Sequence, residues 1–396
     1  MRKSLLTAAV AAATLPLLAA CTENAGSSTD GSSDSRTVAV TSTDDGCKVS
    51  AASAPAGTLT FEVTNSGSDV TEFYLLGEDG LSIVGEVENI GPNLTKKLVL
   101  SAHAGDYFTA CKPGMKGDGI KAAFKVAESK DAPSVSASDA ELIKTAETNY
   151  RAYVQDQSTE LLAKTREFVA AYKAGKDDDA RALYPVARTH WERIETVAES
   201  FGDLDPKMDA READVDFAAG EKWTGWHRIE KDLWPARAEK YAPLSAKERA
   251  RYADDLLANT EVLDKRIQAT GEAELDYSVD AITNGSRGLL EEVATGKVTG
   301  EEEYWSRTDL WDFQANVDGA RVGFEGVKPI LEKKDPELAE QLTERFAALQ
   351  KLLDQHRKGD GFQTYDELSK DDVDALAAAV NALSEPLSRL TAAVVD

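Results

Sequence analysis

The sequence has 396 residues, enough for two or three domains that each bury a core of their own. It carries 70 Asp plus Glu against 45 Lys plus Arg, which gives a formal net charge of -25 at neutral pH. An acidic excess of this size argues against binding nucleic acid or an anionic membrane surface by charge, and it suits a protein that concentrates cations.

The chain begins with a pattern typical of an export signal. Two positive charges, Arg2 and Lys3, precede an apolar run in residues 1–20 that is too short for a resident transmembrane helix. The run ends in Leu18-Ala19-Ala20-Cys21, which resembles the bacterial lipobox. We therefore expect an extracytoplasmic lipoprotein, anchored to the cell membrane through lipids on Cys21. The small, polar residues 21–35 are interpreted as a flexible tether.

Residues 36–127 have the pattern of a small all-β domain. Short runs rich in Val, Thr, Phe and Tyr are separated by Gly, Asn and Asp turns, and six or seven strands of this kind indicate a Greek-key sandwich. In an oxidising compartment, Cys47 and Cys111 are expected to form a disulfide. A blue-copper site needs two histidines, and His103 is the only histidine in this region.

After a linker in residues 128–140, residues 141–396 have the pattern of an all-α helical bundle. Apolar side chains recur at helical spacing from Leu142 to Tyr172, with no Gly or Pro between them. The connecting loops are short, so the helices are expected to be antiparallel neighbours. Further helical patterns cover roughly residues 177–201, 221–239, 246–271, 277–297, 301–332, 336–357 and 371–394.

Carboxylates gather along the 177–201 pattern and in the loop that follows it. Glu192, Glu195 and Glu199 follow i, i+3, i+7 spacing and would form one stripe on a helix. Such glutamates are usually solvated, but like charges repel, and a shared cation would remove that repulsion. The acidic loop that includes Asp209 lacks the glycine and the terminal glutamate of an EF-hand, so calcium is not favoured.

The segment "GWHRIEKDLW" places His227 and Glu230 three residues apart, on one face of a helix. An imidazole combined with carboxylates suits iron, manganese or zinc, and helical bundles assemble such sites from inward-facing side chains. A zinc protease of the His-Glu-x-x-His type is not favoured, because the chain has four histidines and no His-Glu pair. Asp309 and Asp312 share a face with Asn316, and this spacing fits both a ligand role and a solvated helix start.

Six segments of the helical region resemble, in order, the imelysin-like domain of EfeO-type iron uptake proteins. The resemblance implies that His227 and Glu230 form the family's His-x-x-Glu metal motif. It places further acidic ligands on Glu192, Glu195 and Asp209. The segments are "RTHWERIE", "DLDPKMDARE", "GWHRIEKDLW", "LLEEVATGKVTGEE", "TDLWDFQANVDG" and "DGFQTYDELS".

The same resemblance implies a cupredoxin-like fold for residues 36–127. It matches Cys47, Glu72 and Cys111 to positions that hold copper in relatives. This chain has Thr109 where some relatives have a methionine, which counts against copper unless Met115 substitutes for it. A Cys47–Cys111 disulfide is ranked ahead of a copper site.

The function implied by the resemblance is iron capture. Such a protein would bind Fe²⁺ or Fe³⁺ and deliver it to a membrane permease, with a haem peroxidase performing the oxidation. No nucleophile–base pair is visible, so a carrier without turnover is expected. The alternatives are a ferroxidase or metallopeptidase with the same site, a metal-bridged binder of acidic polysaccharide, and a structural surface protein. Zinc and calcium are less favoured than iron, and copper in the sandwich stays open.

Overall fold

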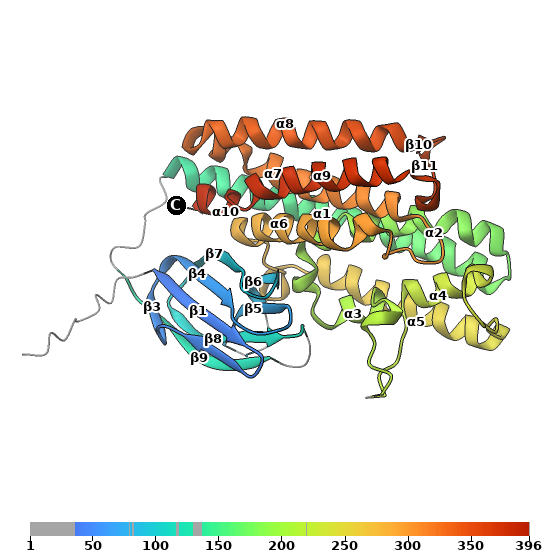
Figure 1. Ribbon diagram of the computed structural model, residues 1–396, viewed down its shortest axis with the longest axis horizontal. Coiled ribbons are helices and arrows are strands. Elements are labelled where there is room, and N and C mark those ends of the chain that lie inside the picture. The colour runs from blue at the N-terminus through green and yellow to red at the C-terminus, as the bar shows by residue number, and fades with distance from the viewer. Residues whose placement is uncertain are drawn as a thin grey trace, which may run out of the picture. The chain divides into compact units, whose positions relative to one another are not determined.

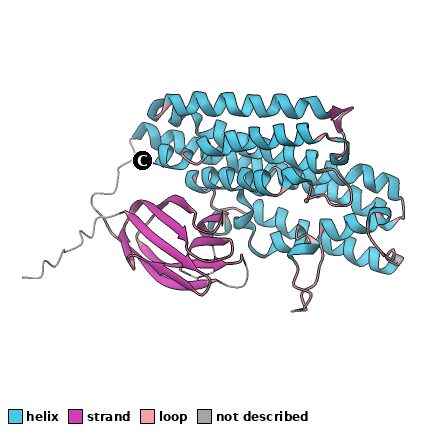
Figure 2. Cartoon of the chain, in the orientation of Figure 1, coloured by secondary structure: helices cyan, strands magenta, loops and turns pink. Residues whose placement is uncertain are grey.

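In the computed structural model, a β-sandwich is followed by a helical domain, which confirms the predicted fold class (Figures 1 and 2). The structure describes residues 36–78, 80, 83–115, 119–129, 137–218 and 220–395. The expected signal peptide, the tether and Cys21 lie outside these residues. Within the described ranges, no helix is long and apolar enough to cross a membrane.

The sandwich consists of two sheets. One has the strand order β2-β1-β4-β7 and the other β3-β9-β8-β5-β6; β1 pairs with β4 in parallel, as β3 does with β9. The strands are β1 (Thr37–Thr43), β2 (Gly46–Val49), β3 (Ser53–Pro55), β4 (Gly57–Asn65), β5 (Thr71–Leu76), β6 (Ile83–Ile90), β7 (Thr95–Ala102), β8 (Gly105–Pro113) and β9 (Ile120–Ala127).

Strict alternation in the sequence explains how the two sheets share a core. In β4, every second residue is buried, and Phe61 contacts Phe73 and Phe124 of the opposite sheet at ring-centroid distances of 5.2 and 5.5 Å. The sequence pattern missed β2, β3 and β6. Two of these strands are very short, and β6 is an edge strand whose centre carries Gly85, Glu86 and Glu88 in place of an apolar alternation.

A disulfide joins the two sheets of the sandwich. Cys47 in β2 and Cys111 in β8 are bonded, with their Cα atoms 5.5 Å apart. Glu72 is buried but lies opposite Lys112 in β8, so its side chain is on the other face of the sheet from Cys111. It accepts a hydrogen bond from the Tyr74 hydroxyl, and its carboxylate lies 3.5 Å from the Lys112 ammonium. Because both sulfurs are in the disulfide, these residues offer no thiolate to a copper ion.

The helical domain begins with α1, a helix of 37 residues. Two apolar clusters line it: one packs its N-terminal end with α6 to α10, and the other packs the rest with α2, α4 and α5. The helices are α1 (Ala137–Lys173), α2 (Asp177–Glu192), α3 (Asp205–Met208), α4 (Trp226–Leu233), α5 (Ala246–Ile267), α6 (Val279–Thr295), α7 (Asp309–Lys334), α8 (Pro336–Leu353), α9 (Lys370–Leu387) and α10 (Leu390–Val395).

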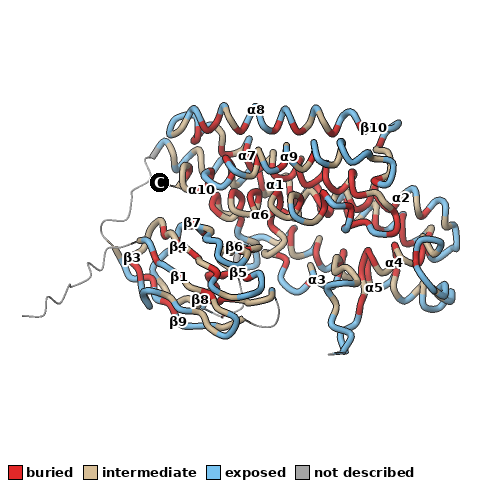
Figure 3. The backbone as a smooth tube through the Cα atoms, viewed as in Figure 1, coloured by how far each residue is buried: buried red, intermediate tan, exposed pale blue. Residues whose placement is uncertain are grey.

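The outer helices are amphipathic, as the 3.6-residue period predicts. Figure 3 shows α8 alternating between buried and exposed along its length, and the residues it buries include Leu342, Phe346 and Leu349. A short hairpin of β10 (Arg357–Lys358) and β11 (Gly361–Phe362) connects α8 to α9, and the sequence pattern did not predict it.

Three of the predicted helices depart most from their patterns. The 177–201 pattern is interrupted after Glu192 and continues as the 3₁₀ segment η1 (Glu195–Leu204). Of the 221–239 pattern, only α4 and the 3₁₀ turn η3 (Pro235–Arg237) are helical. The 301–332 pattern becomes helical only at Asp309. These interruptions leave non-helical segments in the middle of the domain, and the candidate site is built from them.

Candidate metal centre

His227 stands in the first turn of α4 and is fully buried. The helix can start there because residue 225 is a glycine. Gly225 has φ 86° and ψ -162°, a region that is essentially restricted to glycine. A Cβ atom at this position would lie 2.1 Å from the carbonyl oxygen of Met208. The start of α4 is thereby packed directly against the residue that precedes Asp209.

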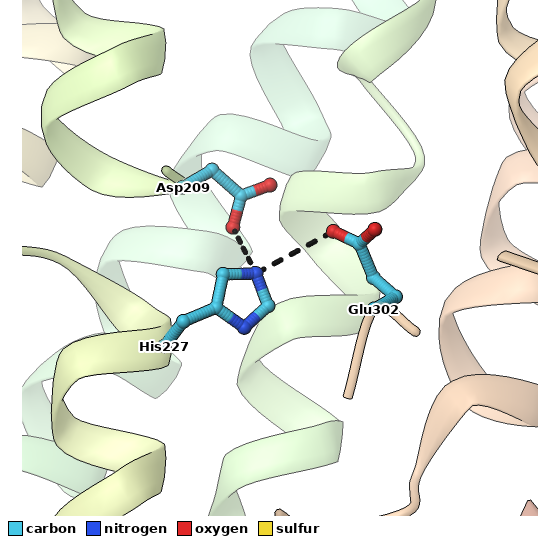
Figure 4. Close-up of side chains that lie close together, drawn as sticks. All are labelled: Asp209, His227 and Glu302. Atoms are coloured by element: carbon cyan, nitrogen blue, oxygen red, sulfur yellow. Dashed lines mark ion pairs between the residues drawn. The ribbon is translucent and has the colours of Figure 1, made fainter. Parts of the chain in front are cut away.

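Two carboxylates face Nε2 of His227. Oδ1 of Asp209 and Oε1 of Glu302 each lie 3.4 Å from this nitrogen (Figure 4). The nitrogen is buried and has a hydrogen bond with neither oxygen. Single oxygen or nitrogen atoms of the three side chains lie within 4.8 Å of one another, which is compatible with one shared ion.

The other ring nitrogen, Nδ1, faces Glu230 and Glu303, which are both fully buried. Oε2 of Glu230 is 3.3 Å from Nδ1, and Oε1 of Glu303 is 3.9 Å away. His227, Glu230 and Glu303 form a second triple that satisfies the same distance limit. Here the carboxylates have other partners, because Glu303 accepts hydrogen bonds from the Tyr184 hydroxyl at 3.1 Å and from Oγ of Ser306 at 2.7 Å.

A buried arginine holds the carboxylates around His227. The guanidinium of Arg188 has no exposed surface and pairs with Asp209 and Glu192, and its Nε lies 2.7 Å from Glu303 and 3.4 Å from Asp312. The indole of Trp191 donates to the second oxygen of Asp209 at 2.7 Å. Asp209 is therefore fixed from two sides, and its Oδ1, which Arg188 binds, is also the oxygen that faces the histidine.

The electrostatics differ between the two faces of the imidazole. Burial alone would raise the pKa of Glu302, but the charges of Lys297 and His227 outweigh it and lower that pKa to about 2. Burial also opposes the charge on Asp209, and Arg188 with His227 still lowers the pKa of Asp209. By contrast, burial and repulsion from Glu230 raise the pKa of Glu303 to about 8. At neutral pH the Nε2 face thus has two ionised carboxylates.

The pKa of His227 itself is raised well above its ordinary value. Burial and the charge of Arg188 act in the opposite direction, and interactions with Asp209, Glu230 and Glu302 override them. A metal ion must compete with a proton at this ring.

Glu192 and Glu195, expected as ligands, lie around a lysine. Nζ of Lys297 is 2.8 Å from Oε2 of Glu192 and 2.7 Å from Oε2 of Glu195, and the side-chain amide of Asn316 donates to the same two oxygens. The predicted stripe of three glutamates is interrupted, because α2 ends at Glu192. The structure brings Glu192 to His227 only through Arg188, and it brings Asp209 and Glu230 there directly.

Asp309, Asp312 and Asn316 do share one face of α7, as the spacing predicts, and all three are buried. Each leaves one oxygen without a hydrogen bond: Oδ2 of Asp309, Oδ1 of Asp312 and Oδ1 of Asn316. Burial raises the pKa of Asp309 to about 7 and raises that of Asp312 well above its usual value. They line the interior beside Arg188 and Glu303 and not the Nε2 face of His227.

Sequence reasoning missed Glu302, Glu303, Arg188 and Lys297 as parts of the site. The two glutamates fell inside the 301–332 helical pattern, where charged residues at a helix start are usually exposed. Arg188 gave one usable signal, since it stands four residues before Glu192, a spacing that favours an ion pair on a helix.

Comparison with known proteins assigns both parts of the chain. The profile of the imelysin family matches residues 146–390, and that of the cupredoxin-like domain matches residues 8–123. Proteins named iron uptake system component EfeO, from Escherichia coli (strain K12) and from Shigella flexneri, are 38% identical over 355 residues. The match covers 89% of this chain and 90% of theirs.

A solved structure is also similar. The crystal structure of a protein described as an iron-regulated protein A precursor, from Parabacteroides distasonis, aligns with a TM-score of 0.46 and 14% identity. The alignment covers 67% of this chain and 97% of that one.

Proposed function

The chain belongs to the imelysin-containing EfeO family of iron uptake components, and we propose that it captures iron outside the cytoplasmic membrane at His227. Its role in iron uptake follows from the 38% identity to EfeO over 89% of the chain. The ligand set, the mode of delivery and the partners are the parts that we propose.

The observation that carries the proposal is the Nε2 face of His227. A buried ring nitrogen without a hydrogen bond lies 3.4 Å from one oxygen each of Asp209 and Glu302. One nitrogen with two carboxylates is a donor set that suits iron, and the 2-His-1-carboxylate sites of iron enzymes use the same ligand types in another ratio. Small displacements of the three side chains would bring their atoms to bonding distance.

The same face offers the ion a route to the solvent. The side chains of Asp209 and Glu302 are each 8% exposed, whereas His227 is fully buried. Outside them, Arg211 is 37% exposed, and its guanidinium lies 3.7 Å from Oε2 of Glu302. A site of this kind, one layer below the surface, can exchange its ion without unfolding, as a carrier must.

In this proposal, iron is cargo and no reaction takes place on the protein. The partners are a membrane permease that accepts the ion and a haem peroxidase that oxidises it, as the family resemblance suggests. The lipid on Cys21 would keep the carrier at the membrane. The acidic surface, with its net charge of -25, would raise the local concentration of cations.

Metal counting on the full chain tests the site. We expect the protein to bind iron at His227, and His227→Ala and Asp209→Asn each to lose one equivalent while keeping the wild-type circular dichroism. The matched control is His190→Ala, because His190 is a partly buried histidine that pairs with Gln157 at 2.9 Å. Equal stoichiometry in wild type and both site variants would refute the proposal.

Carrier and enzyme are distinguished by turnover. A ferroxidase would consume oxygen continuously when Fe²⁺ is in excess, and a metallopeptidase would cleave a peptide in the presence of metal. A carrier stops at one equivalent per site. Sustained oxygen consumption that disappears in Asp209→Asn would show that the site is catalytic.

A further inference from the structure

We propose that Glu230, the acid of the His-x-x-Glu pair, positions the site and does not ligate the ion. It would fix His227 through Nδ1 and would hold in place the turn that carries Glu302. This inference rests on the proposed function, since it concerns which side of His227 receives the iron.

The hydrogen bonds of Glu230 carry the argument. Its carboxylate is fully buried, and Oε1 accepts from two backbone N–H groups, those of Trp305 at 2.8 Å and Ser306 at 2.6 Å. Oε2 is 3.3 Å from Nδ1 of His227. An ion on Oε1 would have to displace one of these two buried backbone N–H groups, which would then lose its acceptor, and Oε2 already faces the imidazole.

The backbone N–H groups that Glu230 binds belong to the segment that supplies Glu302. The guanidinium of Arg237 donates to the carbonyl oxygens of Trp305 and Ser306 at 3.0 and 3.1 Å. The backbone of this segment is thus bound at its N–H groups by Glu230 and at its carbonyl oxygens by Arg237. Consecutive residues, Glu302 and Glu303, then point to opposite nitrogens of the same imidazole.

Ligand chemistry favours the same assignment. A histidine that donates Nδ1–H to a carboxylate presents the lone pair of Nε2, and the carboxylate makes that nitrogen a stronger ligand. Nε2 of His227 is the ring atom that is buried without a hydrogen bond and that faces Asp209 and Glu302.

The test identifies which nitrogen of His227 binds the ion. The full chain, labelled with ¹⁵N-histidine, is titrated with Ga³⁺ or Zn²⁺, which are diamagnetic, and the ring ¹⁵N signals are recorded. With four histidines, the His227 signals are assigned from a His227→Gln variant. We expect the ion on Nε2 and a retained N–H on Nδ1. An ion on Nδ1 would overturn the positioning role alone, whereas unperturbed His227 signals would refute the proposed function itself.

Glu230→Gln gives the second readout. The amide oxygen can still accept from Trp305 and Ser306, so the fold should persist, but the amide NH₂ would now donate to Nδ1. The proton of the ring is then forced onto Nε2, the nitrogen that should bind the ion. We expect affinity for Zn²⁺ to fall about 10- to 100-fold, the range for residues that support a ligand. Unchanged affinity in the folded variant would contradict the proposal.

Discussion

Oε1 of Glu302 lies 3.4 Å from Nε2 of His227, so the turn before α7 completes a site that begins on α4. Glu302→Gln should therefore weaken iron binding by more than ~100-fold, the upper range for residues that only support a ligand. Equilibrium dialysis with the full chain measures the change. The neighbouring Glu301 is exposed, which makes Glu301→Gln a matched control. Equal losses in the two variants would point to net charge and not to ligation.

The glycine at position 225 should be required for iron affinity as well as for folding. Alanine there adopts a backbone conformation essentially closed to it, and its Cβ would meet the Met208 carbonyl at 2.1 Å. We expect Gly225→Ala to displace His227 from Asp209 and to lower affinity in the fraction that folds. Gly220→Ala is the control, because Gly220 also has positive φ but no atom within 4 Å of the added Cβ. Full affinity in folded Gly225→Ala would refute this role.

Lys297 should contribute to stability more than to iron binding. Its ammonium is buried between Glu192 and Glu195, and removing one partner of a buried pair typically costs about 3–5 kcal/mol. Urea unfolding of Lys297→Gln should show a loss of this size in the free energy of unfolding. Lys207→Gln removes an exposed pair with Asp203 and should cost no more than about 1 kcal/mol. Metal counting should give unchanged iron stoichiometry in both variants, and a lost equivalent would return Glu192 and Glu195 to the ligand set.

His190 should make stability depend on pH. Burial, with the charges of Arg193 and Lys164, lowers its pKa to about 4. The unfolded chain, where histidine titrates near 6.5, binds the proton first, so stability falls as pH drops from about 6.5 to about 4. Urea unfolding at several pH values should give a smaller dependence for His190→Gln across this window. Parallel curves for wild type and variant would contradict the assignment.

The disulfide should stabilise the sandwich and leave the iron site intact. Cys47 and Cys111 are 64 residues apart, and closing a loop of this length is worth about 4 kcal/mol in the chain-entropy model. Cys47→Ser/Cys111→Ser should unfold the sandwich at lower urea, followed by near-ultraviolet circular dichroism. Bound iron should stay at the wild-type level, and its loss would place a metal site in the sandwich.

Regular patterns in the sequence predicted most of the fold. The alternation in β4 and the 3.6-residue period of α8 each place the apolar side chains on one face of the element, and in both cases that face is buried. Prediction was weakest where polar contacts override the local pattern. Residues 301–308 look helical, but the N–H groups of Trp305 and Ser306 bind Glu230, and Arg307 has φ 63°.

For the site, the sequence and the family resemblance predicted His227, Glu230 and Asp209 and could not rank their roles; the structure brings the three close together. Spacing along a helix says which side chains share a face, and it says nothing about partners from distant segments. Arg188 and Lys297 each sit among carboxylates that are remote in sequence, and those contacts appear only in the folded chain. Glu192 and Glu195 illustrate this limit of helical spacing, because the cation between them is the ammonium of Lys297, from a distant segment of the chain.

The segment between Asp209 and His227 starts and ends at two of the proposed ligands. Once an ion bonds both, this stretch of chain becomes a closed ring, and the exposed Phe217 lies on its outer part. The two ends of this stretch are also tied to each other directly, because the indole of Trp223 donates to the carbonyl oxygen of Ala210 at 2.7 Å and the hydroxyl of Thr224 to that of Lys207 at 2.8 Å. The ring would thus close on a connection that the protein already holds together, so an ion bound there would add a second link between the same two ends and would leave α1 and the two cores unchanged.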